Sequence, residues 1–481
     1  RQKGSAMQIW LGVDLGTSAL KATAVDEDGL VLARASAGYE THRPHESWVE
    51  QDPRDWLSAL SKVLTELDID LTKVAGVGIV GQTPTLVVTD SLGNPLRPAM
   101  TWQDTRSQKE ADLFAAEIPD VAKDFGLSLP WAPSGILPKV RWLKVHEPKV
   151  LTKGSRLLQA KDFLLFHLTG EFASDNWSSK GLIHATTLKP TKAWDSLGLP
   201  NELIPRIGKP WDVAAKTSVS NKFLPPGIPV AIGWSDALAG MLALEVFSKP
   251  TAFVISGSSD IAGISCTKLS EGKHNLSTVP ESCAPLPVIF GPTQSSGSAI
   301  SWAAELFNST PEELLSKSLE SSNAHNEIFL PFLAGERAPI WRSDIRALFA
   351  GLSHQSKFSD IAHAVIFGVG FTARHIIDQA KSLSKELPSV VHLGGASHQS
   401  KLWLDIRSRI LRSEVVSFSE SDSSSIGAAI LAASAATGIS PEVLAPKFSG
   451  EKLHFTSTIE DQNMADTEYQ KYLDWVERSI H

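Results

Sequence analysis

Two glycine–hydroxyl turns, one in each half of the chain, are the segments with the clearest chemical potential. The first holds Gly16, Thr17 and Ser18, and the second holds Gly257, Ser258 and Ser259, each set between two apolar runs. A glycine lets backbone N–H groups and neighbouring hydroxyls approach a phosphate that a Cβ would block. One such turn has an ordinary steric explanation, but two at corresponding places predict two related lobes that grip a nucleotide triphosphate.

Two aspartates lie where an apolar run ends. Asp14 stands inside the run before the first turn, where an unpaired carboxylate is expensive to bury. Mg²⁺ prefers oxygen ligands, so Asp14 is a candidate magnesium ligand beside a triphosphate. An aspartate satisfied by neighbouring backbone N–H groups remains the alternative.

Asp236 lies at the second strand end, within AIGWSDALAG. Phosphoryl transfer to a hydroxyl needs a group that accepts the hydroxyl proton, and we predict that Asp236 is this general base. The alternative is a helix cap, because Ser235 and Asp236 are both good N-cap residues for the apolar helix that follows.

Further binding candidates lie in loops. Gly394 and Gly395 follow an apolar strand and leave room for a flat group such as adenine against the backbone, with Ser400 as a polar edge. Trp48 and Trp102 lie in loops of the first half, where an indole ring can stack on a sugar.

The elements that must position these residues alternate between strand and helix patterns, which predicts the α/β class. Because the strand–turn–strand pattern occurs twice, we expect two copies of one fold. Ser359 is a plausible N-cap of the long amphipathic helix, and the polar C-terminal end is expected to be peripheral. The predicted elements are hairpins at 9–26 and 251–266, helices at 53–66, 295–307 and 359–383, strands at 74–81 and 85–90, a strand–turn–helix unit at 228–247, and a strand and helix at 390–403.

Composition excludes several classes of protein. The 481 residues carry a net charge of −8 and no dense Lys/Arg tract, so nucleic acid and anionic membrane are not expected partners. Only two cysteines occur, which excludes a disulfide framework and fits a cytoplasmic protein. No apolar stretch is long enough to span a membrane. Residues 1–6 are interpreted as an expression remnant before Met7.

From Ile9 to about Ala436 the chain resembles the FGGY family of carbohydrate kinases. The order and spacing of eight segments carry the resemblance, and FLPFLAGERAPIWRSDIRALFAGL is the most specific of them. The other seven are GVDLGTSALK, ESWVEQDPRDW, GIVGQTPT, TWQDTR, AIGWSDALAG, GGASHQSKLW and SSIGAAILAA.

The resemblance implies two ribonuclease-H-like domains of the actin and hexokinase type that flank a nucleotide cleft. Residues 7–246 would form the N-terminal domain, with the sugar site, the first phosphate loop and the catalytic Asp. Residues 247–460 would form the nucleotide-binding C-terminal domain. ATP and Mg²⁺ are the implied cofactors, a small sugar or polyol is the implied partner, and a homodimer is the assembly usual in the family.

The resemblance also implies roles at matching positions. Asp236 would be the catalytic base and Asp14 the magnesium-associated residue. The ATP-binding residues would be Thr17, Ser18, Lys21, Gly257, Ser258, Gly297, Gly394, Gly395 and Ser400, and the substrate-binding residues Trp48, Gln82, Thr83, Trp102 and Asp236.

The departures from the family pattern fall mainly where the sugar is chosen. Gln82 is followed by Thr83 and Pro84, not by the Met-His-Gly of xylulokinases or the Arg-Glu of glycerol kinases. Ala237 stands where Asn or Gln is usual, and Asp260 where Gly is common.

We therefore expect an ATP-dependent kinase for a small sugar or polyol, with a ketopentose such as xylulose as substrate. Two alternatives remain open: a catalytically weak, sugar-sensing homologue, and an actin-like ATPase that acts on a protein partner.

Overall fold

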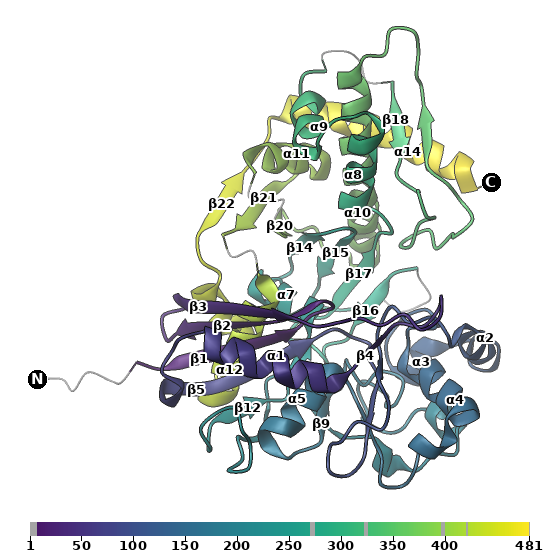
Figure 1. Ribbon diagram of the computed structural model, residues 1–481. Coiled ribbons are helices and arrows are strands. Elements are labelled where there is room, and N and C mark those ends of the chain that lie inside the picture. The colour runs from purple at the N-terminus through teal and green to yellow at the C-terminus, as the bar shows by residue number, and fades with distance from the viewer. Residues whose placement is uncertain (1–6, 270–274, 322–325, 396–399, 420–421, 481) are drawn as a thin grey trace, which may run out of the picture. The chain divides into compact units, whose positions relative to one another are not determined.

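The computed structural model describes residues 7–480 except 270–274, 322–325, 396–399 and 420–421, so residues 1–6, the expected expression remnant, lie outside the described residues. The chain divides into two compact units, which are described separately (Figure 1). Unit 1 contains the chain up to Ser248, Val279–Pro285 and Asp422–Gly450. Unit 2 contains Lys249–Thr278, Leu286–Ser421 and the chain from Glu451.

Unit 1 is built on a mixed sheet in the order β11-β12-β5-β1-β2-β3, with β13 beside β5. These strands are β1 (Ile9–Leu15), β2 (Ala19–Asp26), β3 (Val31–Gly38), β5 (Val74–Gly81), β11 (Val213–Lys216), β12 (Pro229–Ala231) and β13 (Trp234–Ser235). β1 and β2 pair antiparallel and β1 and β5 pair parallel, which confirms the first predicted hairpin and the strand at 74–81.

Helices and short strand pairs complete unit 1. The helices are α1 (Pro53–Glu66), α2 (Gln108–Glu117), α3 (Val121–Phe125), α4 (Ile136–His146), α5 (Ala160–Thr169), α6 (Lys192–Asp195), α7 (Asp236–Ala243), α12 (Ser423–Thr437) and α13 (Pro441–Phe448). The pairs are β4 (Glu50–Gln51) with β7 (Ala99–Met100), β6 (Val87–Thr89) with β8 (Arg156–Leu158), and β9 (Ala173–Asp175) with β10 (Arg206–Gly208).

The two faces of the unit 1 sheet are covered differently. Leu11 and Val13 of β1 share a buried apolar cluster with Trp56 of α1. Alternate residues of a strand point to opposite faces, so Gly12 and Asp14 face the other layer, where α12 packs on β1 and β5. A Cβ built on Gly12 would lie 2.1 Å from the Ser425 carbonyl oxygen, so only glycine lets the helix approach this closely.

The packing of α12 places the domain boundary differently from the expected ranges. The family resemblance implies that residues 247–460 form the second domain, whereas Asp422–Gly450 belongs to compact unit 1. The reason lies in the strands that α12 covers: a Cβ on Gly78 of β5 would lie 1.9 Å from the Ala428 carbonyl oxygen. The small-residue helix and the glycines of β1 and β5 fit one another.

Unit 2 repeats the strand order of unit 1. Its sheet runs β16-β17-β15-β14-β20-β21-β22, so the segment β17-β15-β14-β20-β21 matches β3-β2-β1-β5-β12. The hairpin of β14 and β15 is antiparallel and β14 pairs parallel with β20, as expected for two copies of one fold. The strands of this sheet are β14 (Ala252–Ser256), β15 (Asp260–Ser265), β16 (Ser277–Val279), β17 (Val288–Pro292), β20 (Val390–Gly394), β21 (Glu414–Phe418) and β22 (Lys452–Phe455). A separate pair is formed by β18 (Ile328–Leu330) and β19 (Leu348–Ala350).

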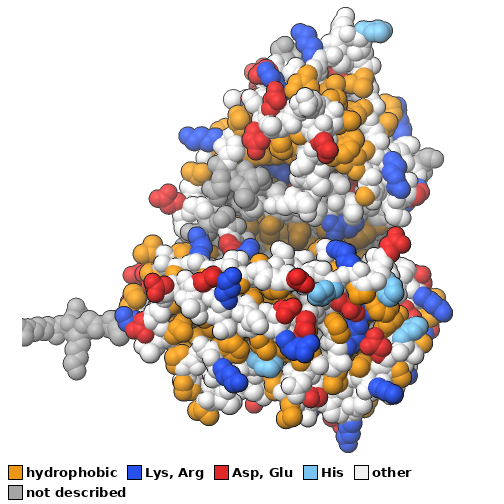
Figure 2. Space-filling view, in the orientation of Figure 1, with side chains coloured by type: hydrophobic (Ala, Val, Ile, Leu, Met, Phe, Trp, Pro, Cys, Tyr) orange, Lys and Arg blue, Asp and Glu red, His pale blue; other side chains and the backbone are white. Residues whose placement is uncertain are grey.

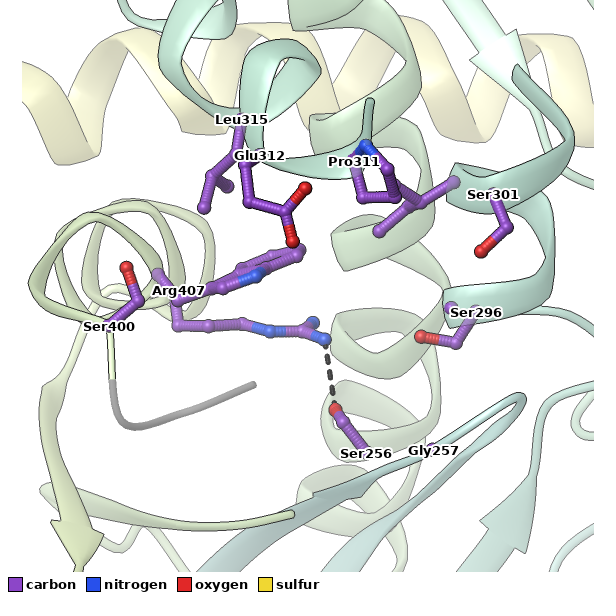
Figure 3. Close-up of a pocket in the computed structure, with 12 residues that line it drawn as sticks. Ser256, Gly257, Ser296, Ser301, Pro311, Glu312, Leu315, Ser400 and Arg407 are labelled. Atoms are coloured by element: carbon purple, nitrogen blue, oxygen red, sulfur yellow. Dashed lines mark hydrogen bonds between the residues drawn. The ribbon is translucent and has the colours of Figure 1, made fainter. Parts of the chain in front are cut away.

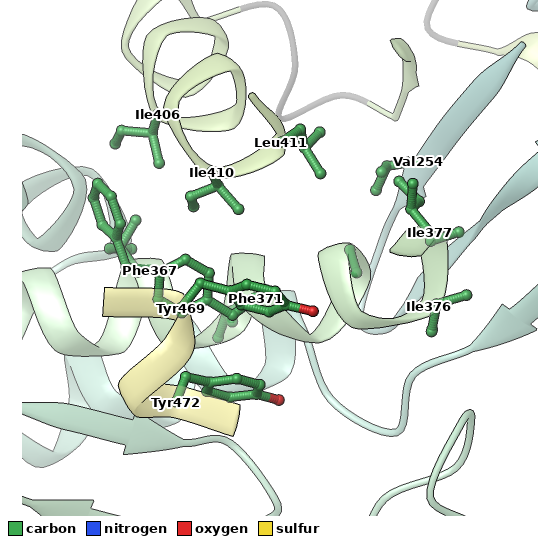
Figure 4. Close-up of a cluster of buried hydrophobic side chains, with 14 of the residues drawn as sticks. Val254, Phe367, Phe371, Ile376, Ile377, Ile406, Ile410, Leu411, Tyr469 and Tyr472 are labelled. Carbon is green, nitrogen blue, oxygen red and sulfur yellow. The ribbon is translucent and has the colours of Figure 1, made fainter. Parts of the chain in front are cut away.

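The helices of unit 2 correct two expectations. They are α8 (Gly297–Leu306), α9 (Pro311–Ser318), α10 (Phe358–Ser384), α11 (Lys401–Leu411) and α14 (Ile459–Ile480). The long amphipathic helix is confirmed as α10, but its N-cap is Lys357 and Ser359 lies inside the first turn. The polar C-terminal end is not peripheral: Tyr469 and Tyr472 of α14 are buried beside Phe371 of α10 (Figure 4). A helix with one apolar stripe buries that stripe although its composition is polar.

The surface of unit 1 agrees with the charge distribution of the sequence. On the face shown in Figure 2, acidic and basic side chains are interspersed and do not form a single basic stripe. In the described part of the chain, every helix is too short or too polar to cross a lipid bilayer.

Candidate active site

Asp14 lies near the end of β1 with its carboxylate buried. Its Oδ2 accepts a 2.6 Å hydrogen bond from the Ser424 hydroxyl, at the start of α12. Its Oδ1 is buried and has no hydrogen-bond partner among the described residues. Burial, together with the charge of Asp236, raises the pKa of Asp14 to about 7. The charge of Lys21 lowers the pKa of Asp14 only in part, so the effect of burial dominates at this carboxylate.

These features fit a divalent cation. Mg²⁺ takes oxygen ligands and can be held by one carboxylate while keeping several waters. The orphaned Oδ1 of Asp14 supplies such an oxygen, whereas the described residues contain no cluster of three or more His, Cys, Asp or Glu side chains that could enclose a metal. The arrangement fits a magnesium ion that accompanies a triphosphate better than a dedicated metal centre.

Asp236 is the first residue of α7, and Ser235 is the N-cap. The Ser235 hydroxyl accepts from the Leu238 N–H at 3.3 Å, so the side-chain capping bond at this helix is made by the serine. Asp236 Oδ1 accepts from the Ala237 N–H at 2.7 Å. The side chain is half-buried, and burial raises its pKa to about 6. Because Ser235 is the N-cap of α7, the helix does not need Asp236 as its N-cap.

The first glycine turn joins β1 and β2. The Thr17 hydroxyl accepts from the Trp102 indole N–H at 3.0 Å, and the Thr17 carbonyl accepts from the Gln51 amide at 2.7 Å. Ser18 is exposed. Lys21, on β2, lies 3.4 Å from an Asp422 oxygen and keeps 43% of its side chain exposed. Thr17 and Trp102, predicted separately for phosphate and sugar, are thus in direct contact.

Gln82 follows β5 and is fully buried. Its amide N–H₂ donates to Gln51 at 2.8 Å, while its own oxygen has no partner among the described residues. The Gln51 oxygen also accepts from the Trp56 indole at 3.2 Å. The neighbouring Thr83 is half-buried and donates to the Gly81 carbonyl. Gln82 is therefore held by a second glutamine that sequence reasoning did not single out.

Trp48 is packed against a cation within unit 1. The Arg106 guanidinium lies 3.8 Å from the centre of the Trp48 ring and is ion-paired to Asp104 and Glu50. Arg106 covers one indole face, and the rings of His45 and Trp142 also pack against Trp48, so only part of its surface is left for a sugar. The TWQDTR segment carried the signal for this pair, since Asp104 and Arg106 are two residues apart.

Lys139 is a further residue that sequence reasoning missed. It is fully buried on α4, and its ammonium donates to the carbonyls of Pro84 at 3.0 Å and Thr101 at 2.8 Å. Burial lowers the pKa of Lys139 to about 7. The lysine ties the loop after Gln82 to the loop that carries Trp102, and a lone lysine in a helix pattern gave no sign of this.

A cavity of about 650 Å³ opens in unit 2 between the β14–β15 turn and helices α8, α9 and α11 (Figure 3). Three predicted ATP-binding residues line it: Gly257, Gly297 and Ser400. The other lining residues are Ser256, Ser296, Ile300, Ser301, Pro311, Glu312, Leu315, Trp403 and Arg407.

Glycine is required where α8 meets the second glycine turn. A Cβ on Gly297 would lie 2.6 Å from the Gly257 carbonyl oxygen. Ser258 is exposed, and its carbonyl accepts from the Ser296 and Ser298 N–H groups at 2.9 and 3.2 Å. The turn and the start of α8 therefore form one hydrogen-bonded unit, with the Ser258 side chain at the surface.

Gly394 ends β20 and Gly395 follows it, but neither is among the residues that line the cavity. A Cβ on Gly395 would lie 2.1 Å from the Ser256 carbonyl oxygen, and the residue has a φ of 102°. Glycine is needed here because β14 approaches so closely. This structural reason holds whether or not Gly395 also contacts adenine.

Asp260, the departure in the second turn, is neutralised inside unit 2. It is fully buried on β15 and pairs with Arg407 of α11 at 2.9 Å. Its charge is therefore compensated by a neighbouring guanidinium.

Two ranges of the chain match a known family. Residues 9–243 match the FGGY family of carbohydrate kinases, N-terminal domain, and residues 252–436 match its C-terminal domain. The fold and the residues together thus define a carbohydrate kinase, and the chain belongs to the FGGY family.

Relatives of known name support this assignment. The chain is 27% identical over 451 residues to the xylulose kinase of Lactococcus lactis, covering 89% of this chain and 88% of the relative. It is 30% identical over 443 residues to a xylulose kinase of Staphylococcus epidermidis, with the same coverage of both chains. A gluconokinase of Bacillus subtilis is 25% identical over 454 residues and covers 88% of this chain and 86% of its own.

Solved structures show the same fold. A xyloylose kinase from Brucella ovis superimposes with a TM-score of 0.88 at 26% identity, covering 97% of this chain and 98% of that one. A gluconate kinase from Lactobacillus acidophilus gives 0.88 at 21% identity, with 99% of each chain covered, and therefore supports the fold alone. The expected two-domain α/β fold is confirmed, and the protein is an ATP-dependent sugar kinase.

Proposed function

We propose that this kinase transfers the γ-phosphate of ATP to a hydroxyl of a ketopentose such as xylulose. The observation that carries the mechanism is Asp236, a half-buried carboxylate at the start of α7 whose capping function is performed by Ser235. The relatives at 27 to 30% identity that are named xylulose kinase support the substrate class.

Asp236 acts as the general base in this proposal. With a pKa raised to about 6, it is largely ionised near neutral pH and still basic enough to accept a hydroxyl proton as the oxygen attacks phosphorus. The Ala237 N–H holds one carboxylate oxygen by a 2.7 Å bond and fixes the orientation of the group. The other oxygen is the one that we assign to the substrate.

The sugar-binding residues are assigned around the first glycine turn. Gln82 offers an oxygen with no partner among the described residues, and Trp102 presents an indole that is 39% exposed. Thr83 and the open surface of Trp48 complete the set. Ala237 has no side-chain donor, so hydrogen bonds to the sugar hydroxyls must come from these other residues.

Asp14 would hold Mg²⁺, directly or through water, and the ion would balance charge on the transferring phosphoryl group. Within unit 1, Lys21 and the hydroxyls of Thr17 and Ser18 are assigned to phosphate binding. Unit 2 is assigned the nucleotide, through the cavity lined by Gly257, Gly297 and Ser400 and through the predicted contacts of Ser258, Gly394 and Gly395.

The substrate assignment is tested by ADP release measured with a panel of D- and L-ketopentoses, pentitols, glycerol and gluconate. We expect a ketopentose to give the highest kcat/KM. A higher value for gluconate or glycerol would contradict the proposed substrate and leave the kinase assignment intact. Sugar binding in calorimetry with no sugar-stimulated ADP release would instead support the sugar-sensing alternative.

A further inference from the structure

Arg407 stretches across the floor of the unit 2 cavity (Figure 3). One of its three nitrogens, Nη2, donates to Asp260 Oδ2 at 2.9 Å and to the Ser256 hydroxyl at 3.2 Å. These bonds fix the end of the side chain at the base of the second glycine turn. Only 1% of the Arg407 side chain is exposed.

The other two guanidinium nitrogens are unsatisfied. Nε and Nη1 are buried and have no hydrogen-bond partner among the residues that the structure describes. Leaving buried charged donors without acceptors is costly, and such groups in a native structure call for a partner. The anchor at Asp260 therefore uses one nitrogen and leaves Nε and Nη1 without an acceptor among the described residues.

The walls around Arg407 suit a flat ring. Ile300, Pro311 and Leu315 line the same cavity, and the Trp403 ring centre lies 5.0 Å from the Arg407 guanidinium carbon. A planar guanidinium both stacks on aromatic faces and donates to ring acceptors. A purine base offers such a face together with ring nitrogens that accept hydrogen bonds.

We propose that Arg407 is a nucleotide-contacting residue that binds the purine base of the phosphate donor, and that Asp260 positions it. The proposal rests on the nucleotide site assigned to unit 2 and adds a recognition element to that site. It also explains the acid at position 260: the carboxylate supports Arg407 and does not face the phosphates as an uncompensated charge.

The test uses the full chain and removes the ion pair as a unit, because Arg407→Met alone would leave Asp260 buried and unpaired. The variant is D260N/R407M. Its matched control is D405N/R409M, which removes the 2.7 Å pair of Arg409 and Asp405 on the same helix, together with the 3.0 Å pair of Arg409 and Asp461, away from the cavity lining. Affinities for adenosine, AMP and ADP are measured by calorimetry without sugar.

We expect D260N/R407M to weaken all three ligands by a similar factor of about tenfold or more, the loss of charge-assisted hydrogen bonds. In turnover assays the KM for ATP should rise while the KM for the sugar stays unchanged. The control should bind all three ligands like the wild type. Adenosine affinity within twofold of wild type in a folded D260N/R407M, or a loss that grows with each phosphate, would overturn the proposal.

If the double variant does not fold, Arg407→Lys tests the contact between Arg407 and the base. Lysine keeps a positive charge for Asp260 but lacks the planar fork. Adenosine affinity should therefore fall in the same direction, and an unchanged affinity would refute the base contact. Failure of the wild type to bind any adenine ligand would refute both this inference and the nucleotide site. A different sugar in the substrate panel would affect only the proposed substrate.

Discussion

The two glycine hairpins share a backbone design but treat their buried acids in opposite ways. In β1–β2, Asp14 precedes the turn and keeps one oxygen without a hydrogen-bond partner among the described residues. In β14–β15, Asp260 follows the turn and is paired with Arg407 at 2.9 Å. Desolvation raises the pKa of Asp14 to about 7. The acid of the first hairpin can therefore bind a cation, whereas the acid of the second is already paired with the Arg407 guanidinium.

This difference indicates that the duplicated fold has been specialised by a few side chains. Both hairpins bury a carboxylate, and a buried carboxylate needs compensation. In unit 2 the compensation is a permanent part of the protein, whereas in unit 1 we assign it to Mg²⁺ that accompanies the nucleotide.

Neutralising each buried acid in turn tests whether Asp14 and Asp260 have different roles. Asp14→Asn should reduce kcat/KM at limiting Mg²⁺ by at least about tenfold, because a proposed metal contact is lost. Asp260→Asn should retain kcat at saturating ATP but lower the melting temperature, because Arg407 is left buried without its counter-ion. Kinetics over a Mg²⁺ titration, with thermal melting in parallel, distinguish the two. Equal effects of both substitutions on the Mg²⁺ dependence would contradict the assignment.

Packing beneath the first hairpin can be tested with Gly78→Ala. The added Cβ would lie 1.9 Å from the Ala428 carbonyl oxygen, and we expect a destabilisation of about 1–3 kcal/mol or more, with a lower melting temperature. Gly154→Ala is the matched control, since no atom lies within 4 Å of its added Cβ. An unchanged melting temperature for Gly78→Ala would show that α12 does not pack on β5 as described.

The pH dependence of activity tests whether Asp236 acts as the base, because its pKa differs from that of an exposed aspartate. A base must be ionised to act, and a pKa raised to about 6 means that protonation begins to remove activity at a higher pH than for an exposed aspartate. We expect kcat/KM for the sugar to fall below about pH 6, approaching tenfold per pH unit. A profile that stays flat down to pH 4.5 would argue against Asp236 as the base.

Much of the fold was predictable because glycine, proline and apolar periodicity are local signals. The hairpin at 9–26 and the helix at 53–66 were found from such patterns. The return of α12 to unit 1 was not, because it depends on Gly12 and Gly78 leaving space for a helix that lies more than 300 residues later in the chain.

The residues of the candidate site also fall into those that a local sequence pattern reveals and those that it does not. Asp14 and Asp236 were found because an acid beside an apolar run is conspicuous. Ser424, Gln51, Lys139 and Arg407 were missed, since each acts through a partner that is distant in sequence. The role of Asp260 became clear only with Arg407, because an ion pair between a strand and a helix leaves no periodic signal.

The most direct test of the account is sugar-stimulated ADP release by Asp236→Asn, measured beside Asp28→Asn, a substitution at an exposed acid in a turn of the same unit. We predict that D236N binds the sugar but loses about 10²- to 10⁴-fold in kcat, as expected for removal of a general base. The D28N control should match the wild type. A folded D236N enzyme with a kcat within a few-fold of wild type would contradict the assignment of Asp236.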